Sequence, residues 1–265
     1  MMHQIQSLPL LLTVLLAFSP MATPSAQAET PSTTLVLAVA NSTCDLFRAL
    51  SQPFQKRTGH TTTLICKSSG RLAKGLAGQA IEADYYLSAN KKWMDFMVAA
   101  QLVQAPLVRQ VWGNTLVVAA PLTTPISLTG LQDLAQPKVS TLLIGDPSTA
   151  PFGRYAKQVL QKANIWSAIR PKIATRLHIT LLAQELEQAN ATTVGILFAT
   201  NLTPKHRLLF AIPAQQQPPI QYFAAPLDKS KHPTEIKEFL QFMQSDEART
   251  IITQAGFLLG EPNTP

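Results

Sequence analysis

The chain has 265 residues and a formal net charge of +7; 46% of its residues are hydrophobic and only 14% are charged. This composition excludes an intrinsically disordered chain, and the length allows either one large domain or two smaller lobes. The positive balance suggests an anionic partner, which leaves nucleic acid, a membrane surface and a small oxyanion open.

Residues 1–28 have the features of an export signal. The apolar run Leu8 to Phe18 is too short to span a bilayer, and the small-residue stretch after it ends in Ala26-Gln27-Ala28, a pattern that signal peptidases accept. We therefore predict a periplasmic protein of 237 residues (265 − 28) after cleavage. An uncleaved membrane anchor is the alternative.

The rest of the sequence alternates predicted strands and helices. Strands are predicted at 34–40, 61–66, 83–88, 115–120, 140–144, 194–198 and 207–212. Helices are predicted at 42–57, 71–79, 91–101, 155–163 and 179–189, with a helical pair between 234 and 254. Residues 213–219, rich in proline and glutamine, are typical of a surface loop. This alternation predicts an α/β fold with mostly parallel sheets.

Small hydroxyl residues follow three of the predicted strands, in the segments 41–43 (NST), 68–70 (SSG) and 146–149 (DPST). In open α/β sheets, ligands bind beyond the carboxyl ends of strands, where helices begin. Serine and threonine there can simply cap each helix. Alternatively, several helix N-termini can converge and bind an oxyanion through backbone N–H groups and hydroxyls, without any lysine or arginine.

Motifs for catalysis are missing from the sequence. It contains no HExxH, GxSxG, CxxC or phosphate-binding GxxxxGK[ST] pattern, and its histidines have no second His or Cys at metal-ligand spacing. Its basic residues form no continuous stripe with aromatic residues. We therefore expect no enzyme, no cofactor, no protein-bound metal and no nucleic-acid partner.

The two cysteines, Cys44 and Cys66, lie near the starts of two candidate binding elements. An oxidising export compartment favours a disulfide between them. A reactive thiol pair is the alternative, and both interpretations stay open because the sequence does not give the distance between the two Cα atoms.

Four segments, in this order along the chain, carry a more specific signal: 83–97 (ADYYLSANKKWMDFM), 113–118 (GNTLVV), 145–157 and 245–257. Together they resemble the periplasmic molybdate-binding proteins, the solute receptors of molybdate ABC transporters. The resemblance extends from about Leu35 to Phe257.

The resemblance implies a two-lobed periplasmic-binding-protein fold of type II, with two crossover strands at a hinge. Lobe I would comprise residues 29–113 and 208–265, and lobe II residues 114–207. Such a monomeric receptor would capture molybdate, and also tungstate, between the lobes and deliver it to an ABC permease in the membrane. The alternatives are a receptor of the same fold for sulfate or phosphate, and an exported thiol redox protein.

The resemblance also implies five site residues. Ser42 and Ser69 would each donate a hydroxyl and an N–H to the anion, and backbone N–H groups near Phe152 would add donors from the third junction. Ile179 would supply another N–H from a segment that matches the family poorly. Phe198 stands where family members often have a tyrosine. Loss of that phenolic hydrogen bond to a charged ligand would be worth about 1.5–3 kcal/mol.

Overall fold

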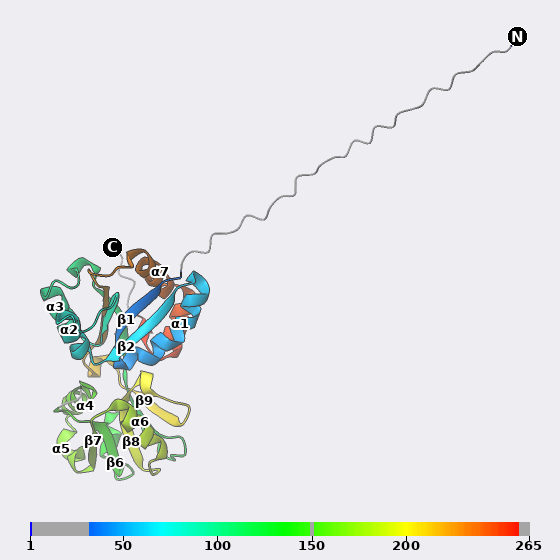
Figure 1. Cartoon of the computed structure of the whole chain (residues 1–265). Helices are drawn as coiled ribbons and strands as arrows, with labels where there is room; N and C mark the ends of the chain where they lie inside the picture. The colour runs from blue at the N-terminus through cyan, green and yellow to red at the C-terminus, as the bar shows by residue number, and fades with distance from the viewer. Residues whose placement is uncertain (2–31, 149–150, 260–265) are drawn as a thin grey trace. The chain divides into compact units, whose positions relative to one another are not determined.

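The computed structural model describes Met1 and residues 32–148 and 151–259, so the predicted signal peptide lies outside the described residues apart from Met1. Two β-sheets with packed helices organise the described chain from residue 32 onward (Figure 1). Among these residues, no helix has the length and apolar character needed to cross a membrane. Each sheet with its helices is called a lobe below.

The sheet of the first lobe has the strand order β11-β4-β10-β3-β1-β2. Its strands are β1 (Thr34–Ala40), β2 (Thr61–Lys67), β3 (Tyr85–Ser88), β4 (Arg109–Asn114), β10 (Ile220–Pro226) and β11 (Leu258–Leu259). Strand β1 is parallel to β2 and β3, whereas β10 is antiparallel to β3 and β4. The continuous apolar run of β1 suits this central position, which is covered on both faces.

The sheet of the second lobe has the order β7-β6-β8-β5-β9. Its strands are β5 (Leu116–Pro121), β6 (Thr141–Gly145), β7 (Ile173–Arg176), β8 (Thr193–Phe198) and β9 (His206–Ala211). Strand β6 is parallel to β7 and β8, and β5 is antiparallel to β8 and β9. The α/β class is confirmed, but the sheets are mixed rather than mostly parallel. The antiparallel pairs arise because β5 and β10 enter their sheets from the other lobe.

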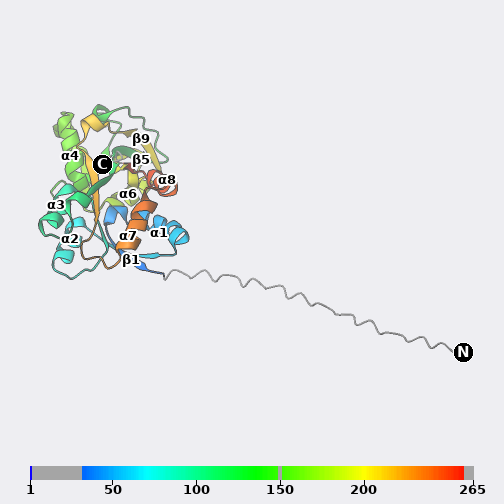
Figure 2. The same ribbon diagram turned by 90° about the horizontal axis from the view of Figure 1, so that it is seen from above.

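Helices cover both sheets. They are α1 (Cys44–Thr58), α2 (Ser69–Ala77), α3 (Lys91–Ala99), α4 (Pro151–Lys162), α5 (Trp166–Ile169), α6 (Ile179–Gln188), α7 (Pro233–Met243) and α8 (Asp246–Gln254). In the first lobe, α2 and α3 lie side by side in both views (Figures 1 and 2), and α1, α7 and α8 form a second group, which Figure 2 shows. Helix α1 ends where Gly59 adopts a left-handed conformation with φ of 80°, which glycine reaches without strain.

An aromatic cluster fills the core beneath α1 and α7. The Phe239 ring meets Phe54 and Tyr85 edge-on, with centroid distances of 5.4 and 5.3 Å. Pairs in this geometry contribute roughly 0.5–1.5 kcal/mol each beyond the area that they bury. These contacts pack α7 against both α1 and β3.

The chain passes between the lobes twice, from β4 to β5 and from β9 to β10. The two passages are joined by hydrogen bonds, since Leu116 N–H donates to Gln217 Oε1 at 2.9 Å and Ile212 N–H donates to the Leu116 carbonyl at 2.9 Å. Because β9 pairs with β5, the chain returns to the first sheet after Ala211, whereas the resemblance implied a return at residue 208. We propose the same two-lobe division with the return moved accordingly.

Candidate functional site

A cleft of about 1400 Å³ is lined by residues from both lobes, at the ends of strands and the starts of helices. The five residues that the resemblance singled out all line it: Ser42, Ser69, Phe152, Ile179 and Phe198. The fold therefore brings together residues that are up to 156 positions apart (198 − 42) around a single hollow.

Ser42 lies in a short 3₁₀ turn, η1 (Asn41–Thr43), which follows β1. The neighbouring Thr43 is fully buried, and its hydroxyl donates to the Ala40 carbonyl at 2.8 Å, which holds the turn closed. Ser42 is only half-buried, and its Oγ accepts a hydrogen bond from the Tyr222 hydroxyl at 3.4 Å. Of the two hydroxyl residues in this turn, only Ser42 lines the cleft.

Ser69 is the first residue of α2 and is 6% exposed. Its Oγ accepts a hydrogen bond from the Ala89 N–H at 3.0 Å, and its carbonyl accepts one from the Tyr86 hydroxyl at 3.0 Å. These contacts fix both the backbone and the side chain of Ser69.

The two serines are in the same hydrogen-bonding state. A hydroxyl has one proton to donate and two acceptor positions. Each of Ser42 and Ser69 uses an acceptor position on a protein donor, and neither donates to a protein acceptor among the described residues. Both protons are therefore available to a ligand in the cleft.

Helices α2 and α6 begin at the cleft without a side-chain cap. Their N-cap residues, Ser68 and His178, make no capping hydrogen bond, whereas Asn90 caps α3 by accepting from the Trp93 N–H at 3.2 Å. Simple helix capping is thus wrong as an interpretation of Ser68. Uncapped helix N-termini present free N–H groups and a partial positive charge, and Ile179 is the first residue of α6.

At the third junction, between β6 and α4, the backbones of two glycines are in close contact. A Cβ on Gly153 would lie 2.4 Å from the Gly145 carbonyl carbon, so the backbones can approach this closely only without side chains. The contact brings Phe152, which is 6% exposed, to the wall of the cleft. Residues 149–150, which include the end of the predicted hydroxyl segment, lie outside the described residues.

Phe198 ends β8 and is 8% exposed. Its ring lies 6.4 Å from Phe152 and 6.4 Å from Tyr155, between centroids, so it forms part of an aromatic wall of the cleft. Two tyrosines that line the cleft, Tyr155 and Tyr222, were not predicted as site residues. Burial raises the pKa of both phenols, so both stay protonated as hydrogen-bond donors at neutral pH.

The charge around the cleft is positive. The basic side chains that line it are all exposed: Arg71, Lys74, Lys92 and Arg154. Asp45 is the carboxylate that lines it, and it forms an ion pair with Arg48. Neutral donors thus lie at the strand ends, while the cations are exposed around them, with Lys74 and Lys92 over the Trp93 ring. Among the described residues, no group of three or more His, Cys, Asp or Glu side chains is arranged to hold a metal ion.

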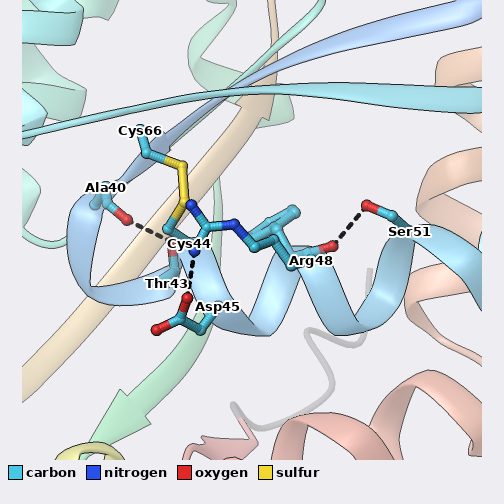
Figure 3. The surroundings of a disulfide bond; sticks show 8 residues. Ala40, Thr43, Cys44, Asp45, Arg48, Ser51 and Cys66 are labelled. Atoms are coloured by element: carbon cyan, nitrogen blue, oxygen red, sulfur yellow. Dashed lines mark hydrogen bonds and ion pairs between the residues drawn. A yellow bond between two sulfur atoms is a disulfide. The ribbon is translucent and has the colours of Figure 1, made fainter.

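A disulfide joins Cys44 and Cys66, with the Cα atoms 5.9 Å apart (Figure 3). Cys44 begins α1, two residues after Ser42. Cys66 lies in β2, three residues before Ser69, and is in register with Val39 of β1. The bond therefore connects the two segments that carry the candidate hydroxyl donors.

Comparisons with known proteins show the family of the chain and the fold that it shares. The sequence model of the bacterial extracellular solute-binding protein family matches residues 35–258. The molybdate-binding protein ModA of Escherichia coli is 26% identical over 233 residues, 85% of this chain and 89% of the relative. That of Haemophilus influenzae is 25% identical over 228 residues, covering 84% and 88%. A solved substrate-binding domain assigned to a molybdenum ABC transporter of Clostridium difficile shares the fold, with a TM-score of 0.78, 22% identity, and coverage of 87% of this chain and 100% of that domain.

Proposed function

The chain belongs to the bacterial extracellular solute-binding protein family, and we propose that it captures molybdate, and also tungstate, in the cleft between its lobes and delivers it to an ABC permease. The relatives at 25–26% identity are molybdate-binding proteins. The function is capture rather than reaction, and the prediction that the chain is not an enzyme is confirmed by its family.

One observation carries the proposal: the cleft collects neutral donors whose protons are not used by the protein. The hydroxyls of Ser42 and Ser69 each accept from the protein and keep a proton to donate. The uncapped N-termini of α2 and α6 add backbone N–H groups. A fully deprotonated tetrahedral oxyanion has acceptors only, so this set of donors suits it.

The volume of the cleft supports capture by closure of the lobes. Small-molecule pockets usually measure roughly 300–1,000 Å³, and this cleft, at about 1400 Å³, is larger. Donors on both lobes reach one small anion only if the lobes approach each other, and binding then favours the closed form. Selection of molybdate and tungstate over sulfate would follow from the size of the closed cavity, because their metal–oxygen bonds are longer.

Phe198 distinguishes this cleft from that of family members with a tyrosine at the corresponding position. Its ring gives the anion an apolar wall and no donor. The affinity therefore rests on the two serines, the backbone N–H groups near Phe152 and Ile179, and any phenol elsewhere in the cleft.

Export and transfer complete the proposed role. We propose that residues 1–28 direct the chain to the periplasm and are removed, and that the mature protein acts as a monomer. Its membrane partner would be the permease of a molybdate ABC transporter. Light scattering of the purified mature protein measures its molar mass and so tests whether it is a monomer.

The test of the proposed function is calorimetric titration of refolded, ligand-free protein with molybdate, tungstate, sulfate and phosphate. We expect heat and saturable one-site binding with molybdate and tungstate, and much weaker binding of the other two. The double variant Ser42→Ala/Ser69→Ala should lose at least about tenfold in affinity, since a hydrogen bond to a charged group is worth about 1.5–3 kcal/mol.

The matched control is Ser127→Ala, an exposed serine of the second lobe that does not line the cleft. It should bind as the wild type does. The absence of heat with molybdate would refute the proposal, and tighter binding of sulfate or phosphate would reassign the receptor to that anion.

A further inference from the structure

Tyr222 is a buried polar group in the cleft that the sequence did not identify. It lies in β10, between β3 and β4 of the first sheet, and is 1% exposed. Its ring packs edge-on against Phe257 at a centroid distance of 5.3 Å. The packing holds the ring, and the hydroxyl points to Ser42.

The hydrogen bonds around Tyr222 have a defined direction. Asn114 Oδ1 accepts from the Thr115 N–H at 2.8 Å, which fixes the amide so that its Nδ2 group faces the other way. That Nδ2 donates to the Tyr222 hydroxyl at 3.3 Å and to Thr200 Oγ1 at 3.0 Å. The Tyr222 hydroxyl in turn donates to Ser42 Oγ at 3.4 Å.

This direction determines what Ser42 does. Its oxygen accepts a hydrogen bond from the phenol, so the serine O–H is left to donate to a ligand in the cleft. Donors linked in series polarise one another, which strengthens the last donor in the series. The distance of 3.4 Å is longer than usual for a bond between two hydroxyls.

Asn114 also connects the series to the hinge. It is the last residue of β4, where the chain leaves the first lobe, and Thr200 follows β8 of the second lobe. One amide therefore bonds to the cleft tyrosine and to the other lobe at once.

We propose that Tyr222 and Asn114 are positioning residues for oxyanion capture: the series Asn114 Nδ2–H, Tyr222 O–H, Ser42 O–H orients the Ser42 hydroxyl so that it donates a hydrogen bond to the anion. By strengthening the Ser42 hydroxyl as a donor, Tyr222 partly compensates for the phenolic hydroxyl that is missing at Phe198. This inference rests on the proposed function, because it assumes that Ser42 contacts the bound anion.

The experiment is a double-mutant cycle measured by molybdate calorimetry on the mature protein, using Tyr222→Phe, Ser42→Ala and the combination. A net hydrogen bond of ordinary strength corresponds to about three- to tenfold in affinity. We expect Tyr222→Phe to weaken molybdate binding by about that factor in the wild-type background and to have no further effect in the Ser42→Ala background. A purely structural tyrosine would weaken both backgrounds equally.

Tyr85→Phe is the matched control, because it removes the same atom from a buried tyrosine of the adjacent strand β3 that does not line the cleft. It should bind as the wild type does. If Tyr222→Phe does not fold, as judged by circular dichroism, Asn114→Ala replaces it and should show the same loss only when Ser42 is present. Equal affinity of Tyr222→Phe and wild type, or equal losses in both backgrounds, would overturn the inference. Failure of the wild type itself to bind molybdate would instead overturn the proposed function.

Discussion

Removing the disulfide between Cys44 and Cys66 should destabilise the protein by about 3 kcal/mol. The bond closes a loop with a sequence separation of 22 residues, and in the chain-entropy description a loop of this length restricts the unfolded chain by about that amount. For a protein of this size, each kcal/mol shifts the melting temperature by roughly 2–4 °C. The double variant Cys44→Ser/Cys66→Ser should therefore melt roughly 6–12 °C below the wild type.

Thermal melts followed by circular dichroism, with and without reductant, measure this shift. Reductant should lower the melting temperature of the wild type and leave that of the double variant unchanged. Thiol counting should find no free thiol in the native wild type. The reasoning would be refuted by a melting temperature within about 2 °C of the wild type. Retained molybdate binding by the double variant would separate a structural bond from a thiol redox role, because the latter needs the sulfurs themselves.

Three further predictions concern the cleft and the buried tyrosines. Gly153→Ala places a Cβ 2.4 Å from the Gly145 carbonyl carbon, so α4 must shift, and we expect a lower melting temperature and loss of molybdate binding in calorimetry. Phe198→Tyr adds a phenol to the cleft wall, and we expect molybdate binding to become about ten- to a hundredfold tighter in the same assay; weaker binding would mean that the ring is too close to the anion for a hydroxyl. Burial raises the pKa of Tyr85 and of Tyr222, and that of Tyr86 to about 12. At high pH these phenols therefore ionise more readily in the unfolded chain than in the folded protein. Their contribution to stability is fully present below about pH 10, the pKa of tyrosine in the unfolded chain, and is lost as the pH rises above that value. Denaturant melts should therefore show a free energy of unfolding that falls above about pH 10, with a constant tyrosine contribution below that pH.

The elements that the sequence predicts well are those whose burial leaves a clear pattern. Strands β1 and β8 are continuous apolar runs, and their predicted bounds match the structure to within one residue. Strand β4 was missed because its sequence, RQVWGN, is polar and half-exposed. Strand β10 was missed because it follows a loop rich in proline and ends in Pro226. Because Tyr222 lies in β10, its position in the cleft could not be predicted without that strand.

Helix starts are the most important feature for the site; those of α3 and α6 were predicted to the residue, whereas that of α4 was not. Helix α4 begins at Pro151 rather than near Tyr155, since proline suits the first helical turn while Gly153 lowers helix propensity inside it. The sequence also gives no indication that Ser68 leaves α2 uncapped. Whether a serine caps a helix or faces a ligand depends on side-chain direction, which tertiary contacts decide.

The net charge of +7 and the proposed binding site act at different stages of capture. The exposed cations around the cleft lie in solvent, where screening limits their contribution to affinity, but they can raise the rate at which anions arrive. Affinity must come from donors that compensate for the water lost by a dianion. Ser42 and Ser69 are oriented by protein donors before any ligand binds, so little further ordering is needed when the anion enters. A lysine at either position would add charge but would also bring a flexible side chain to be ordered, so fixed neutral donors are the better solution for a small anion in a closing cleft.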